Sequence, residues 1–141
     1  LQAQGWRVDI AFVLGSDLSE LAELNRRRLQ GAVGITFIAA NELAGALDTG
    51  YRVLIDGIFG TGFSGALPDT VAAVCRRLNA ASGLKVALDI PTGLDCDSGT
   101  ADADTFRADL TYAFAAYKPA HFSDAGKALC GETVCLDIGI D

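Results

Sequence analysis

Short apolar runs alternate along the chain with segments in which apolar residues recur at helical spacing. The runs at 6–14, 35–39, 51–56, 85–90, 110–117 and 133–138 are rich in branched and aromatic residues and predict strands. Between these runs, the spacing predicts a helix at 18–29 that is capped by Asp17, and a second helix at 41–47 that is capped by Asn41. A third predicted helix begins near Pro68 or Asp69 and ends at Gly83.

Near-continuous apolar strands that are separated by helices indicate a mostly parallel sheet with both faces covered. The expected fold class is therefore α/β, with three layers in the order α/β/α. Ligands bind to such sheets beyond the carboxyl ends of the strands. Three segments of this chain follow predicted strands at that edge: 56–65, 89–99 and 117–119.

The composition narrows the classes of protein to consider. The length of 141 residues fits one domain, 1–141, and the net charge of −7 argues against a general nucleic-acid or anionic-membrane partner. No apolar run approaches the roughly 18 residues of a membrane-spanning helix. The four cysteines form no C-x-x-C pair, which is typical of free thiols in a reducing cytoplasm. The only histidine, His121, lies in a polar stretch, and no nucleophile elbow accompanies it.

A glycine-rich segment lies between the strand predicted at 51–56 and the helix that follows. Its residues 60–65 match the pattern G-x-G-x-x-G. Glycines there allow a ligand to approach the backbone, and the start of the helix offers N–H groups to phosphate. The alternative is a turn that only joins strand to helix, and the motif alone does not separate the two. Leu67 and Pro68 also delay the helix beyond its usual start in dinucleotide folds.

Charged side chains follow three of the predicted strands. Asp56 and Asp89 each close an apolar strand, where an unpaired carboxylate is costly; the alternatives are an active site or a cap on the neighbouring loop. Thr92 adds a hydroxyl near Asp89, and such hard oxygen ligands suit a hard cation. Lys118 follows the strand predicted at 110–117. Its ammonium either meets a phosphate or an acid, or reaches from the sheet edge into water.

Five separated motifs then change the interpretation, because they occur together in one order. They are Asp-Gly-Ile-Phe-Gly-Thr-Gly-Phe-Ser-Gly at 56–65, Asp-Ile-Pro-Thr-Gly-Leu-Asp at 89–95, Ala-Asp-Leu-Thr at 108–111, Lys-Pro at 118–119 and Leu-Asp-Ile-Gly at 136–139. In this combination the chain resembles the YjeF amino-terminal domain family, the NAD(P)H-hydrate epimerases. The resemblance runs from about Trp6 to the last residue.

The resemblance implies a Rossmann-like domain that repairs damaged nicotinamide cofactor. The family interconverts the R and S forms of hydrated NADH and NADPH (NADHX and NADPHX), so that a stereospecific dehydratase can restore the cofactor. By the family pattern, Asp56 and Thr92 help to bind a potassium ion, and Asp89 is the expected catalytic residue. The expected contacts with the hydrated dinucleotide come from Gly60, Thr61, Gly62, Phe63, Ser64, Gly65, Ala66, Asp89 and Lys118.

The resemblance also implies a partner domain, and it shows where this chain departs from the family pattern. A further glycine-rich loop of the family, of the type Asn-Asn-Gly-Gly-Asp-Gly, would lie upstream of residue 1, so we expect a domain truncated at its amino end. The segment 136–140 is similar to the last strand before the ATP- or ADP-dependent dehydratase domain of bifunctional members. We therefore expect a fused or separate dehydratase partner. An exposed sheet edge in an acidic domain leads us to expect a homodimer.

Two other functions stay open at this point. An ordinary Rossmann-type oxidoreductase would use residues 60–65 for pyrophosphate and Asp89 for ribose, and it would bind intact NAD tightly. A non-catalytic binding module would keep the fold without the reaction.

Overall fold

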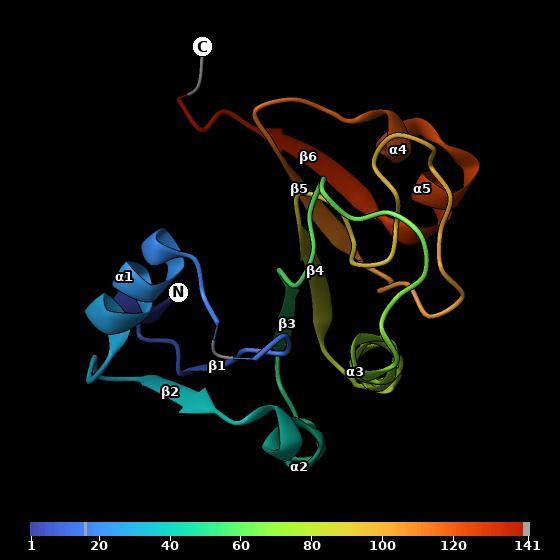
Figure 1. The fold of residues 1–141 in the computed structure, drawn as a ribbon. Coiled ribbons are helices and arrows are strands. Elements are labelled where there is room, and N and C mark those ends of the chain that lie inside the picture. Colours follow the sequence, from blue (N-terminus) through green and yellow to red (C-terminus); the bar gives the residue numbers. More distant parts are fainter. Residues whose placement is uncertain (16, 140–141) are drawn as a thin grey trace. The chain divides into compact units, whose positions relative to one another are not determined.

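The computed structural model describes residues 1–15 and 17–139 (Figure 1). Its contacts divide the chain into two compact units, 1–46 and 47–141. Each unit contains a sheet of parallel strands, in the order β1-β2 in the first and β3-β4-β5-β6 in the second. The predicted α/β class with parallel strands is thus confirmed. The predicted single domain, 1–141, stays a prediction, and Ile140 of the segment 136–140 lies outside the described residues.

The first unit begins with a short 3-10 helix, η1 (Gln2–Gln4), before strand β1 (Val8–Ala11). Strand β2 (Ile35–Ile38) pairs with β1 in parallel register, with Val8 opposite Ile35. The rings of Phe12 and Phe37 stack with centroids 5.9 Å apart at the end of this pair. Both strands are shorter than the apolar runs that predicted them, which extend over 6–14 and 35–39.

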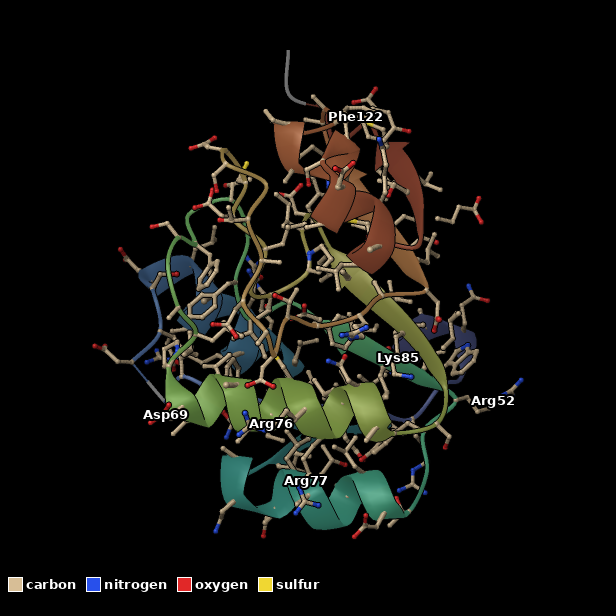
Figure 2. All side chains as sticks on the ribbon, turned by 90° about the vertical axis from the view of Figure 1, so that its right-hand side faces the viewer. Arg52, Asp69, Arg76, Arg77, Lys85 and Phe122 are labelled. Carbon is tan, nitrogen blue, oxygen red and sulfur yellow. The ribbon has the colours of Figure 1, made fainter. Side chains whose placement is uncertain are left out.

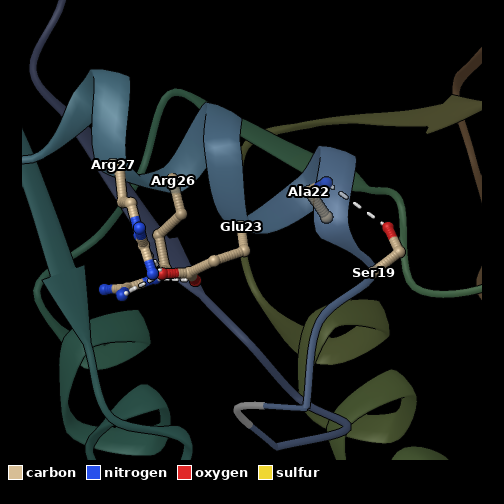
Figure 3. A network of polar contacts seen from close by, with 5 residues as sticks. All are labelled: Ser19, Ala22, Glu23, Arg26 and Arg27. Atoms are coloured by element: carbon tan, nitrogen blue, oxygen red, sulfur yellow. Dashed lines mark hydrogen bonds and ion pairs between the residues drawn. The ribbon is translucent and has the colours of Figure 1, made fainter.

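Helix α1 (Glu20–Leu29) is capped by Ser19 and not by Asp17, so that part of the prediction is wrong. The Ser19 hydroxyl accepts a hydrogen bond from Ala22 N (3.3 Å), which satisfies one of the orphan donors of the first turn. One turn along, Glu23 accepts hydrogen bonds from Arg26 Nε (2.6 Å) and Arg27 Nε (2.8 Å), as Figure 3 shows. These bonds lower the pKa of the Glu23 carboxyl to about 2.

The helix predicted at 41–47 is divided into the 3-10 helix η2 (Ala40–Glu42) and the α-helix α2 (Leu43–Asp48). Asn41 lies inside η2 and does not cap it. Instead, the Glu42 carboxylate accepts a hydrogen bond from Ala39 N at 3.1 Å.

The second unit carries the four-stranded sheet of β3 (Val53–Asp56), β4 (Leu84–Leu88), β5 (Leu110–Phe114) and β6 (Glu132–Leu136). Its helices are α3 (Asp69–Ala80), α4 (Pro119–Phe122) and α5 (Asp124–Leu129). Figures 1 and 2 show α3 and α5 on the same face of this sheet. The prediction of α3 is confirmed. The hydrophobic pattern did not predict α4 or α5, because each is too short to show a helical period.

The core of the second unit lies between this sheet face and the helices. Alternation along β3 buries Leu54 and Asp56, whereas Ile55 on the opposite face is 46% exposed. Helix α3 turns an apolar side toward the sheet and leaves Arg76 and Arg77 exposed (Figure 2). The most deeply buried apolar side chains of the unit include Val71, Cys75, Ala87, Leu94, Phe106 and Ala113. No helix of the described residues is long and apolar enough to cross a membrane.

Candidate functional site

The carboxyl ends of β3, β4 and β5 bring together the residues that the sequence singled out. Asp56 is the last residue of β3, Asp89 directly follows β4, and Lys118 lies four residues beyond β5. Since the strands are parallel neighbours in the sheet, these ends face the same edge. Two polar clusters form there, and the segment 89–92 joins them.

The first cluster is a buried pair of oxygen-bearing side chains, Asp56 and Thr92, which are 1% and 0% exposed. Thr92 donates to the Asp56 carboxylate twice, from its backbone N (2.7 Å) and from its hydroxyl (2.7 Å). Ile58 N also donates to Asp56 (3.2 Å), and Phe59 N donates to the Thr92 hydroxyl (3.0 Å). The pair therefore joins the start of the glycine-rich loop to the turn after β4.

Burial raises the pKa of the Asp56 carboxyl, and the hydrogen bonds from Thr92 and Ile58 oppose that rise. A cation at the Asp56 carboxylate would favour its charged form. Oxygen atoms of a carboxylate and a hydroxyl have the hard character that an alkali cation requires. Among the described residues, however, no group of three or more His, Cys, Asp or Glu side chains surrounds one point. The oxygen atoms of Asp56 and Thr92 thus fit a potassium ion in chemical character.

The second cluster is an ion pair between the carboxylate of Asp89 and the ammonium of Lys118. The two side chains are 18% and 17% exposed, so both charges are largely shielded from water. Phe114 N donates to Asp89 Oδ1 (3.0 Å), and Lys118 Nζ donates to Phe114 O (2.6 Å). The end of β5 therefore holds both members of the pair. Asp89 itself has φ of 68°, a left-handed conformation that is uncommon for residues other than glycine.

The glycine-rich loop leaves open space above its backbone. A Cβ at Gly60, Gly62 or Gly65 would meet no atom within 4 Å. Phe63 turns inward, where it is 9% exposed and stacks on Phe59 with centroids 5.4 Å apart. The aromatic pair therefore anchors the loop, and the glycine backbone is the part that a ligand can approach.

The carboxyl end of the same loop is held by Asp102, a residue that the sequence reasoning missed. Leu67 N donates to Asp102 Oδ2 (3.0 Å), and Asp102 N donates to Gly93 O (2.9 Å). These bonds connect the loop to the turn after β4. Hydrogen bonds from the backbone of Asp104 and Leu67 lower the pKa of the Asp102 carboxyl.

The structure thus pairs Asp56 with Thr92 and Asp89 with Lys118, while the roles assigned to them stay predictions. No role was predicted for a further residue, His121, because it lies in a polar stretch and no nucleophile elbow accompanies it. Its imidazole contacts the backbones of both Lys118 and Asp89. The signal that could have identified it is its position three residues after Lys118, with Pro119 at the start of a helix.

Comparison with known proteins gives related chains and a related fold. The chain is 39% identical over 88 residues to an NAD(P)H-hydrate epimerase of Rhodopirellula baltica, covering 62% of this chain and 36% of that protein. It is 34% identical over 137 residues to the bifunctional NAD(P)H-hydrate repair enzyme Nnr of Archaeoglobus fulgidus, covering 97% of this chain and 28% of that protein. An NAD(P)H-hydrate epimerase of Weissella koreensis is 30% identical over 140 residues, covering 99% of this chain and 62% of that protein.

The fold resembles the crystal structure of yeast ynu0 (YNL200c), with a TM-score of 0.77 at 17% identity. The match covers 96% of this chain and 56% of the yeast chain, and it confirms the predicted Rossmann-like α/β class. The chain spans less than two thirds of each of the three relatives. The family model described as "YjeF-related protein N-terminus" matches residues 1–120. The chain therefore belongs to the family of YjeF-related protein N-terminus domains.

Proposed function

We propose that this chain is the epimerase part of an NAD(P)H-hydrate repair enzyme and interconverts the R and S forms of NADHX and NADPHX. Family membership and the names of the relatives, an NAD(P)H-hydrate epimerase and a bifunctional NAD(P)H-hydrate repair enzyme, support the reaction. The single observation that carries the site is the shielded pair of Asp89 and Lys118 at the carboxyl edge of the sheet. The same edge bears the open backbone of the glycine-rich loop.

The proposed chemistry uses a positive charge that develops on the substrate. The bond between C6 and its hydroxyl oxygen breaks as the ring nitrogen donates its lone pair and an acid supplies a proton, so that water leaves. Water then adds to the other face of the cation and returns a proton to the acid. Asp89 takes a proton from the paired Lys118 ammonium, donates it to the leaving hydroxyl and recovers a proton from the water that adds, and its carboxylate stabilises the cationic ring. Lys118 is hydrogen-bonded to Asp89 and holds the carboxyl in place.

In the proposed complex, the dinucleotide lies along the loop of residues 60–66, and Lys118 also contributes a positive charge to its binding. Asp56 and Thr92 are the proposed side-chain ligands of a potassium ion, which would supply a positive charge at this edge of the sheet. Their oxygen chemistry and the burial of Asp56 support this assignment.

The function is tested by an epimerase assay on the protein that contains this chain, with R-NADHX and with R-NADPHX, coupled to a dehydratase. We expect turnover with potassium present and a lower rate when sodium replaces it. The ordinary oxidoreductase alternative predicts tight binding of intact NAD and no turnover of the hydrated form. Binding of NADHX without turnover would favour the non-catalytic module.

The role of Asp89 has its own test. We expect Asp89→Asn to lower kcat by at least about 100-fold, because removal of a general acid costs about that much. Thermal unfolding should change little, since the amide can still accept the hydrogen bond from Phe114 N. Near-normal turnover by this variant would contradict the assignment.

The remaining proposals concern partners and location. The bifunctional relatives support a dehydratase as partner, fused or separate. The four cysteines are free, which supports a location in the reducing cytoplasm. We also propose that the protein forms a homodimer.

A further inference from the structure

The imidazole of His121 lies between the backbones of the two charged residues of the site. The side chain is buried at 6% exposure, on the short helix α4. Lys118 N donates to His121 Nδ1 (3.0 Å), and His121 Nε2 lies 2.8 Å from Asp89 O. Both ring nitrogens are therefore used, and each contacts a different member of the ion pair.

The two contacts determine how the ring is protonated. A backbone N–H can only donate, so Nδ1 of His121 must be the acceptor in the bond with Lys118. The proton of the neutral ring then lies on Nε2, which donates to the carbonyl of Asp89. Only this tautomer makes both hydrogen bonds.

The contact with Asp89 acts on a peptide in an unusual conformation. The left-handed φ of 68° is costly for a residue that carries a Cβ, so surrounding contacts must hold it. Asp89 N donates to Tyr112 O (2.8 Å) on one side, and its carbonyl accepts from His121 on the other. This conformation points the carboxylate toward Lys118 Nζ and Phe114 N.

We propose that His121 is a positioning residue for this site. Its ring bridges Lys118 N–H and Asp89 C=O, and so it keeps the ammonium and the carboxylate in the geometry that the reaction uses. The inference rests on the proposed function, in which Asp89 handles the proton. Tyr117 packs edge-on against the ring, with centroids 6.1 Å apart, and restrains its orientation.

The test compares variants that separate the ring from its hydrogen bonds. His121→Phe keeps a planar ring of similar size and removes both contacts, and we expect kcat to fall about 10- to 100-fold. KM should change less than kcat, because the glycine-rich loop that is proposed to bind most of the dinucleotide is unchanged. His121→Gln restores a donor that can reach the carbonyl of Asp89, and it should recover most of the lost kcat.

Ser123→Ala is the matched control for simple destabilisation of the same segment. The Ser123 hydroxyl accepts a hydrogen bond from Gly126 N (2.9 Å) and caps α5, yet the reaction does not use it. We expect this variant to lower the melting temperature while kcat stays at the wild-type value. Equal kcat values for His121→Phe and wild type would overturn the inference, as would equal losses in His121→Phe and Ser123→Ala.

If the wild-type protein shows no epimerase activity, the proposed function is refuted. The positioning role of His121 then needs a measurement that does not depend on activity. Nitrogen-15 NMR of the imidazole then reports the tautomer directly. A proton on Nε2, together with a shifted Lys118 ammonium signal in His121→Phe, would support the positioning contact. A proton on Nδ1 in the wild type would refute it.

Discussion

At the scale of single residues, Gly62 and Gly93 are glycines for different reasons. A Cβ at Gly93 would lie 2.6 Å from Thr105 Oγ1, and its backbone has φ of +100°. At Gly62 a Cβ would meet nothing within 4 Å. The fold therefore requires glycine at position 93 and would accept alanine at position 62. The ligand contact proposed for this loop would explain a glycine at position 62.

This contrast predicts opposite effects of two alanine substitutions. Gly62→Ala should change the free energy of unfolding by less than about 0.5 kcal/mol. It should nevertheless raise KM for hydrated dinucleotide by about tenfold, because the added methyl group fills space that the ligand uses. Gly93→Ala should destabilise the protein by more than about 2 kcal/mol. Denaturant unfolding and steady-state kinetics measure both effects, and an unchanged KM for Gly62→Ala would argue against ligand contact at this loop.

At the scale of elements, Asp102 holds the glycine-rich loop to the turn after β4. Its carboxylate accepts hydrogen bonds from Leu67 N (3.0 Å) and Asp104 N (2.9 Å). Both bonds are stronger with the charged carboxylate, which explains why the pKa of Asp102 is lowered. The order of the loop thus depends on a residue far from it in the sequence.

We predict that Asp102→Ala lowers stability in a pH-dependent way. The folded-state pKa lies below the ordinary value of 3.8, so the contribution is fully present above that pH and is lost as pH falls through the folded-state pKa. At neutral pH the variant should lose about 1 kcal/mol, a value reduced because Asp102 is partly exposed to water. Melting temperatures of variant and wild type should converge as the pH falls below about 4. A constant difference across this range would contradict the role of the charge.

At the scale of the whole molecule, the two units differ in how much they bury. None of the described residues in 1–46 is fully buried, whereas the unit from 47 onward contains a core with several side chains at 0% exposure. Because burial of apolar surface provides most of the stabilising free energy, we expect the first unit to be the less stable of the two.

This difference is measurable by amide hydrogen exchange. We expect the amides of β1, β2 and α1 to exchange faster than those of β4 and β5, although all five elements are regular and hydrogen-bonded. Peptide-level mass spectrometry of the native protein would show the difference. Equal protection in both units would mean that other contacts stabilise the first.

A second prediction for the whole molecule concerns its oligomeric state. In the second unit, β3 and β6 are the edge strands of the sheet, and they carry exposed apolar side chains in Ile55 and Leu136. Exposed edges with apolar side chains favour pairing with another chain. We therefore expect a homodimer in solution, and light scattering that gives the mass of one chain would contradict it.

Several features of this protein follow from the sequence alone. The strands and α3 were predicted because apolar periodicity is local and survives whatever the chain does elsewhere. The placement of Asp56, Asp89 and Lys118 at one edge also followed, since parallel strands share their carboxyl ends. The family was identified correctly because five motifs occur in a single order.

Only the tertiary structure decided which of these groups touch. Asp56 contacts Thr92, which is 36 positions away in the chain, and Asp89 contacts Lys118, which is 29 positions away. Both contacts depend on how neighbouring strands are assembled. The left-handed turn at Asp89 and the inward side chain of Phe63 are likewise set by packing. His121 showed no pattern of its own, because its contacts are with two backbone groups that lie far apart in the sequence. Local patterns thus determine the elements, and contacts across the sheet determine the chemistry.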